Sequence, residues 1–187
     1  VTVTNKVIDQ DDGPRKGVTS QSLSKLKPSF RPEGKSTPGN SSQLTDGAGA
    51  VLLTTRSEAE KHNLPILGKI LSHKVVGVAP ELMTTGPAVS IPQALKAAGL
   101  SVEQIDIFEI NEAFASVAVY TMKQLKIPRE KINPNGGAVA LGHPLGATGA
   151  RQVSTLLYEL KRTNKKYGVI SMCIGTGMGA AAVFESE

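Results

Sequence analysis

The chain has 187 residues, enough for one ordinary domain with or without an appendage. Hydrophobic residues make up 40% and charged residues 20%, which is typical of a globular protein and excludes a disordered chain. No apolar run approaches the ~20 residues that span a bilayer, so we expect no membrane span. The net charge is +5, but aromatic residues are only 4% and tryptophan is absent, so we expect no nucleic-acid partner.

The beginning of the chain differs in character from the rest. Residues 1–39 show no hydrophobic periodicity, and Pro28 and Pro32 argue against a long helix. We therefore expect residues 1–39 to form a connecting segment and residues 40–187 to form the folded domain.

Strands and helices are predicted to alternate through this domain. The predicted strands are residues 48–55, 66–78, 106–110, 167–175 and 180–186. The predicted helices are residues 56–63, 87–99, 111–125 and 147–162, with Ser57 expected to cap the first and Asn111 the third. This order predicts an α/β layered domain with a mixed sheet, in which the last two strands form an antiparallel pair.

Two of the predicted helices lack a clear polar face. Residues 113–119 and 147–157 carry small or apolar side chains around most of the circumference. A helix on the surface of a domain normally shows a polar face. We therefore expect both helices to be covered partly by a layer that lies outside this chain.

Residues 133–152, NPNGGAVALGHPLGATGARQ, place His143 in a glycine-rich stretch before a helix. Such a stretch suggests a phosphate loop, but no lysine follows Gly146 or Gly149. The GTGMG segment after strand 167–175 leads into another strand, so a pyrophosphate would meet no helix N-terminus there. We therefore expect no nucleotide site.

Asn111, His143 and Cys173 all lie at predicted strand ends, where α/β folds gather their sites. A thiol tuned by an imidazole, with the unshielded amide of Gly175 as an oxyanion-hole donor, would suit acyl transfer. Each side chain also has a structural interpretation: a buried cysteine, a hydrogen-bonded histidine and a helix N-cap. Because Cys173 is the only cysteine, no intrachain disulfide can form, which favours a reducing compartment.

Three sequence blocks carry a family resemblance: NEAFA at 111–115, the stretch 133–152, and CIGTGMGAAAVFE at 173–185. GNSSQLTDGAGAVLL at 39–53 and LPILG at 64–68 extend it over nearly the whole chain. These blocks resemble the thiolase family and are most similar to the peroxisomal type of 3-ketoacyl-CoA thiolase. The resemblance implies the C-terminal half of a fold in which two βαβαβαββ domains stack as α-β-α-β-α layers and share central helices.

The resemblance also implies a role for each site residue. His143 would take the proton of a nucleophilic thiol and polarise the thioester oxygen, together with a water held by Asn111. Cys173 would be a second thiol that moves a proton to and from the α-carbon or the CoA sulfur, and the Gly175 amide would complete the other oxyanion hole. Ser42 matches a position beside the pantetheine arm of CoA, which is a substrate. No permanently bound cofactor and no metal site is expected.

The chain departs from the family pattern in two ways. The usual M-G-x-G-P appears as M-T-T-G-P at residues 83–87, near where the family binds the acyl chain. The family nucleophile is a cysteine of the N-terminal half, whereas the only cysteine here is Cys173. We therefore expect the attacking thiol to lie outside this chain, and the chain alone to be inactive.

The implied activity is that of an acyltransferase, which cleaves 3-ketoacyl-CoA with CoA to acetyl-CoA and a shortened acyl-CoA in fatty-acid β-oxidation. The implied partners are the N-terminal thiolase half and a second copy in a homodimer. The implied compartment is the peroxisome, with mitochondria and cytoplasm as alternatives because this chain shows no targeting signal. The functional alternatives are a biosynthetic acetoacetyl-CoA thiolase and a non-catalytic thiolase-like protein that binds CoA or lipid.

Overall fold

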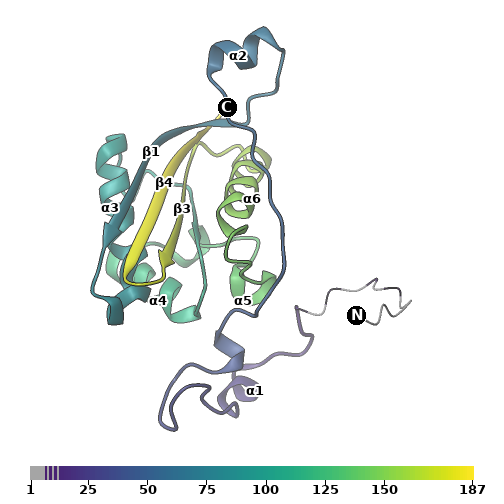
Figure 1. The fold of residues 1–187 in the computed structure, drawn as a ribbon, viewed down its shortest axis with the longest axis vertical. Coiled ribbons are helices and arrows are strands. Elements are labelled where there is room, and N and C mark those ends of the chain that lie inside the picture. Colours follow the sequence, from purple (N-terminus) through teal and green to yellow (C-terminus); the bar gives the residue numbers. More distant parts are fainter. Residues whose placement is uncertain (1–6, 8, 10, 12) are drawn as a thin grey trace.

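The computed structural model describes residues 7, 9, 11 and 13–187, and Figure 1 shows their fold. The strands are β1 (Gly68–Gly77), β2 (Ile107–Ile110), β3 (Tyr167–Ile174) and β4 (Met178–Ser186). The α-helices are α1 (Ser20–Ser24), α2 (Arg56–Lys61), α3 (Gly86–Ala98), α4 (Ala115–Leu125), α5 (Ala138–Leu141) and α6 (Thr148–Arg162). Short 3₁₀ turns occupy Pro38–Asn40, Pro80–Thr85 and Arg129–Lys131.

The four strands form one mixed sheet in the order β1-β4-β3-β2. β2 runs parallel to β3, whereas β4 is antiparallel to both of its neighbours. The mixed sheet and the antiparallel β3–β4 pair confirm the predicted fold class. Because β2 and β3 are parallel, their carboxyl ends lie at the same edge, and the site described below lies at that edge.

Helices cover both faces of the sheet, which makes three layers (Figure 1). On one face α3 and α4 pack against the central strands, and Ile91, Phe108, Val117 and Val183 are fully buried there. Pro87 at the start of α3 and Gly99 in the left-handed conformation at its end fix the limits of that helix, as the sequence predicts.

On the opposite face α6 packs against β2, β3 and β4. Its Leu156 and Leu160 are fully buried and form a second core with Ile107, Ile170 and Phe184. The helix ends with Lys161 and Arg162, whose charges favour a helix C-terminus.

The predicted strand at residues 48–55 is wrong. This segment runs beside α6 without forming a strand (Figure 1), and Leu52 and Leu53 are 78% and 69% exposed. An isolated extended segment cannot satisfy its backbone groups as a strand without a neighbour. In the described part of the chain no strand lies beside it.

Both predicted helix caps are also wrong. Thr55, not Ser57, caps α2 through a hydrogen bond to the amide of Glu58. Helix α4 begins at Ala115, and Asn111 is not its cap because its side chain is turned towards His143. Among the described residues no helix is both long and apolar enough to cross a bilayer.

The outer sides of α4 and α6 carry exposed aromatic and aliphatic side chains. Val119 and Tyr120 on α4 and Tyr158 on α6 are exposed. A covering layer from outside the chain, as predicted from the sequence, would remove these side chains from water.

Candidate active site

Asn111 and His143 meet at the edge of the sheet where β2 and β3 end. Nδ2 of Asn111 lies 3.2 Å from Nε2 of His143. Asn111 is fully buried, and its Oδ1 has no hydrogen-bonding partner among the described residues. This oxygen therefore has the capacity to accept a hydrogen bond from a water or a ligand.

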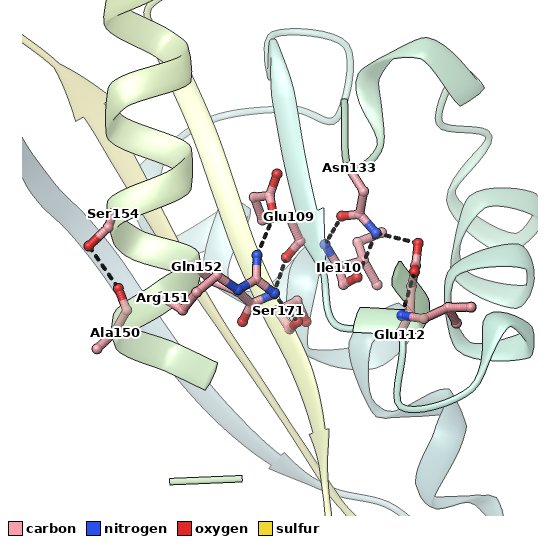
Figure 2. Close-up of polar contacts among 10 residues, drawn as sticks. Glu109, Ile110, Glu112, Asn133, Ala150, Arg151, Gln152, Ser154 and Ser171 are labelled. Atoms are coloured by element: carbon pink, nitrogen blue, oxygen red, sulfur yellow. Dashed lines mark hydrogen bonds and ion pairs between the residues drawn. The ribbon is translucent and has the colours of Figure 1, made fainter. Parts of the chain in front are cut away.

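The backbone around Asn111 is held by two neighbouring segments. The amide of Asn111 donates to the carbonyl oxygen of Ser171 on β3 at 2.9 Å. The side chain of Asn133 donates to the carbonyl of Ile110 and accepts from its amide, and it also donates to Glu112 (Figure 2). These bonds fix the turn that leaves β2 and with it the direction of the Asn111 carboxamide.

His143 is half-buried in the loop that leads into α6. Its Nδ1 lies 2.7 Å from the hydroxyl oxygen of Thr148, the first residue of that helix. Burial lowers the pKa of His143 below its usual range, and the nearby Arg151 charge lowers it further. Both effects favour the neutral ring, which is the form that can accept a proton.

Gly142 explains part of the glycine content before His143. Its φ is +90°, in the left-handed region that favours glycine, and a Cβ atom there would clash with the side chain of Thr45. Gly142 thus lets the His143 loop approach the loop that contains Thr45. The two loops enclose a surface hollow lined by Leu44, Thr45, Asp46, His143 and Leu145.

Ser42 lies beside the turn that follows Asn111. Both its hydroxyl group and its amide donate to the carbonyl oxygen of Ala113, at 3.0 and 3.1 Å. The hydroxyl oxygen keeps lone pairs that can accept a further hydrogen bond. Ser42 thereby joins the N-terminal segment to the site.

Cys173 lies near the end of β3, in register with Gly179 of β4. It is buried, and burial raises the pKa of its thiol above the usual range. No hydrogen bond links Cys173 to Asn111 or His143 in the described chain. Gly175 follows in an exposed turn, where an added Cβ atom would meet nothing within 4 Å, so its backbone is open to an approaching molecule.

A buried ion pair lies behind the site. Glu109 on β2 accepts from Arg151 on α6 at 3.1 Å, and the neighbouring Gln152 donates to the carbonyls of Glu109 and Ser171 (Figure 2). The side chain of Glu109 is only 1% exposed, and burial raises its pKa to about 7 even though Arg151 acts in the opposite direction. Together these bonds fix the first turns of α6 against the ends of β2 and β3.

Four further residues lie at this site and were not predicted from the sequence: Thr148, Glu109, Arg151 and Gln152. The sequence does offer a signal for the ion pair: the only charged residue of 147–157 is an arginine, and a glutamate lies between the apolar residues of the strand IFEI. Opposite charges in two buried elements are expected to pair. Thr148 gave no such signal, because a threonine at the start of a helix is most simply explained as a cap.

Family models match almost the entire chain. The model for the C-terminal domain of thiolase matches residues 64–186, and the model for the N-terminal domain of thiolase matches residues 1–57. The chain belongs to the thiolase family. The first model alone spans more than half of the chain, and the segment without a strand partner at 48–55 lies within the match to the N-terminal domain.

Individual thiolases are similar to the chain in sequence and in structure. Peroxisomal 3-ketoacyl-CoA thiolase B of Mus musculus is 65% identical over 179 residues, which cover 95% of this chain and 42% of that protein. The dimeric peroxisomal thiolase of Saccharomyces cerevisiae is 57% identical with a TM-score of 0.89, over 95% of this chain and 44% of that one. Human mitochondrial 3-ketoacyl-CoA thiolase in complex with CoA is 42% identical with a TM-score of 0.92, and the match covers 96% of this chain and 46% of that one. This chain therefore spans less than half the length of these thiolases.

Proposed function

We propose that this chain supplies the C-terminal part of a 3-ketoacyl-CoA thiolase, an acyltransferase that releases acetyl-CoA from 3-ketoacyl-CoA. The observation that carries the proposal is the 3.2 Å contact between Nδ2 of Asn111 and Nε2 of His143, in a chain 65% identical to a peroxisomal thiolase. In this proposal residues 1–39 connect to the preceding half and residues 40–187 form the C-terminal domain, of which residues 40–57 also match the model for the N-terminal domain.

In the proposed reaction each site residue takes a role that fits its surroundings in the fold. Nε2 of neutral His143 accepts the proton of the attacking thiol and then, as Nε2–H, donates to the thioester oxygen. The free Oδ1 of Asn111 holds a water beside that oxygen. Cys173, kept protonated by burial, serves as an acid and not as the nucleophile. The amide of Gly175 is the donor of the second oxyanion hole.

The attacking thiol comes from a partner in this proposal. Cys173 is the only cysteine of the chain, so an N-terminal thiolase half must supply the nucleophile. Exposed Leu52 and Leu53, which lie in the match to the N-terminal domain, are a surface that this half would cover. CoA would reach the hollow beside His143, and Ser42, two positions before Leu44 of its lining, would be the contact for the pantetheine arm.

Likeness to the peroxisomal relatives supports β-oxidation in the peroxisome, and likeness to the dimeric yeast thiolase supports a homodimer. Retention of Asn111, His143 and Cys173 together supports catalysis over mere CoA or lipid binding, since a binder needs none of them. Rates of thiolysis on long-chain and on four-carbon 3-ketoacyl-CoA would separate this proposal from a biosynthetic acetoacetyl-CoA thiolase.

A two-part assay tests the proposal. The purified 187-residue chain should release no acetyl-CoA from 3-ketoacyl-CoA and CoA. The same chain joined to the cysteine-bearing half of a peroxisomal relative should release it, and His143→Ala should abolish the release. A joined protein that is folded by circular dichroism but inactive would overturn the proposal, and CoA binding without turnover would then favour the non-catalytic alternative.

A further inference from the structure

The hydroxyl group of Thr148 lies between the ring of His143 and a backbone carbonyl. Its oxygen is 2.7 Å from Nδ1 of His143 and 2.9 Å from the carbonyl oxygen of Pro144. Thr148 is 1% exposed, so water does not compete for these bonds. Its backbone amide also donates to the Pro144 carbonyl, which fixes the start of α6.

Counting protons assigns the state of the ring. A hydroxyl group carries one proton, and that of Thr148 is directed to Pro144. With its proton on the Pro144 carbonyl, which can only accept, the hydroxyl is left to accept from Nδ1, and this arrangement places the hydrogen of the ring on Nδ1. On the other side of the ring the Nδ2 donor of Asn111 faces Nε2, which must therefore present its lone pair. Both contacts give the same assignment.

We infer that Thr148 is a positioning residue, whose hydroxyl group fixes neutral His143 as the Nδ1–H tautomer and so makes Nε2 the proton-accepting nitrogen. The two nitrogens of a neutral imidazole share one proton, and a hydrogen bond at one nitrogen decides which nitrogen is basic. The catalytic meaning of this tautomer rests on the proposed function, whereas the tautomer itself does not.

The same contact remains useful after proton transfer. When Nε2 takes a proton, Nδ1 keeps its hydrogen and Thr148 continues to accept from it. No proton has to move at Nδ1 during a cycle, whereas the Nδ2 donor of Asn111 must turn away from Nε2 once that nitrogen carries a hydrogen. The bond from Nδ1 to Thr148 also becomes stronger, because hydrogen bonds from a charged donor are stronger than neutral ones.

The chain contains a matched control for this threonine. The hydroxyl group of Thr163, just after α6, donates to the carbonyl of Glu159 four residues earlier, as Thr148 does to Pro144. Thr163 has no bond to an imidazole among the described contacts. Thr163→Val therefore removes the same kind of threonine-to-backbone bond without touching His143.

Nitrogen NMR of the ¹⁵N-histidine-labelled 187-residue chain tests the tautomer directly. Above the pKa of the ring, His143, assigned by loss of its signals in His143→Gln, should show a protonated Nδ1 and an unprotonated Nε2. Thr148→Val should move the signals towards the Nε2–H pattern, whereas Thr148→Ser and Thr163→Val should leave them unchanged. An Nε2–H pattern in the unaltered chain, or no change in Thr148→Val, would overturn the inference.

Kinetics of the chain joined to the cysteine-bearing half test the consequence. Thr148→Val should lower kcat about 10–100-fold, part of what a general base contributes, with little change in KM. Thr148→Ser should restore most of the rate, and Thr163→Val should keep it. A Thr148→Val enzyme with unchanged kcat would overturn the positioning role. An inactive unaltered enzyme with the Nδ1–H pattern would instead refute the proposed function and leave the tautomer standing.

Discussion

Nδ2 of Asn111 and Nε2 of His143 are 3.2 Å apart although 32 positions separate the two residues in the chain. The contact joins the end of β2 to the loop before α6, so it exists only when both elements are packed on the same edge of the sheet. Asn111 does not cap α4, because that helix begins at Ala115 with Phe114 at its cap position.

Asn111→Ala should lower kcat for thiolysis about 10²–10³-fold in the chain joined to a cysteine-bearing half, since one donor or water ligand of an oxyanion site is lost. The helix α4 should be unaffected, because Phe114 occupies its cap position. Initial rates of acetyl-CoA release and far-ultraviolet circular dichroism measure the two effects.

Asn135→Ala is the control for Asn111→Ala, because Asn135 is exposed in the glycine-rich stretch. It should leave the rate intact, because its side chain hydrogen-bonds Glu159 and not His143. If Asn111→Ala kept the full rate, the assignment of Asn111 to the site would be wrong.

Gly142→Ala should destabilise the chain by about 1–3 kcal/mol, because the added Cβ would force a left-handed residue and meet the Thr45 side chain. Urea denaturation measures the change. Gly146→Ala is the matched control: it lies in the same loop, has no positive φ, and its added Cβ would meet nothing within 4 Å. Equal stability of the two variants would contradict this account of the loop.

The sequence predicted those elements whose signals are local. Helix α3 is delimited by Pro87 and Gly99, which act within one turn of the chain. Strand formation at residues 48–55 depends instead on a neighbouring strand, and no local pattern reveals whether that neighbour is in the chain. The apolar run AVLL at residues 50–53 therefore predicts a buried strand correctly only where a neighbouring strand pairs with it.

In the candidate site, too, some residues could be predicted from local signals and others could not. Asn111 and Cys173 were predicted as site residues because they lie at strand ends, and parallel strands bring their carboxyl ends together. The ion pair of Glu109 with Arg151 depends on which side of α6 faces β2, and the contact of Thr148 with His143 depends on how the loop turns. Both contacts depend on tertiary packing, which the local sequence around each residue does not reveal. For Thr148 the local pattern predicts only a helix cap.

Glu109→Gln should weaken the dependence of stability on pH. The pKa of Glu109 is raised from 4.5 to about 7, so the folded chain binds its proton more tightly than the unfolded chain does. The stability from this proton is fully present below pH 4.5 and is lost as the pH rises through 7. The difference is at most on the order of 3 kcal/mol.

Chemical denaturation of both proteins between pH 5 and pH 8 tests this prediction for Glu109. The unaltered chain should lose stability relative to Glu109→Gln as the pH rises, while the opposite contribution of His143 is common to both and cancels. Parallel curves for the two proteins would show that Glu109 does not titrate in this range.

Cys173 should react slowly with iodoacetamide at pH 7.5 in the folded chain. Only the thiolate reacts, and burial both raises the pKa of this thiol and restricts access to it. A higher pKa lowers the thiolate fraction, so alkylation should be slower in the folded chain than in the unfolded chain. Mass spectrometry follows the reaction without ambiguity, since the chain has a single cysteine.

The control is an exposed cysteine: Ser57→Cys on the surface of α2, made in a chain that also carries Cys173→Ser. If Cys173 reacted as fast as this exposed thiol, it would have the properties of a nucleophile, and its assignment as the proton-donating thiol would fail.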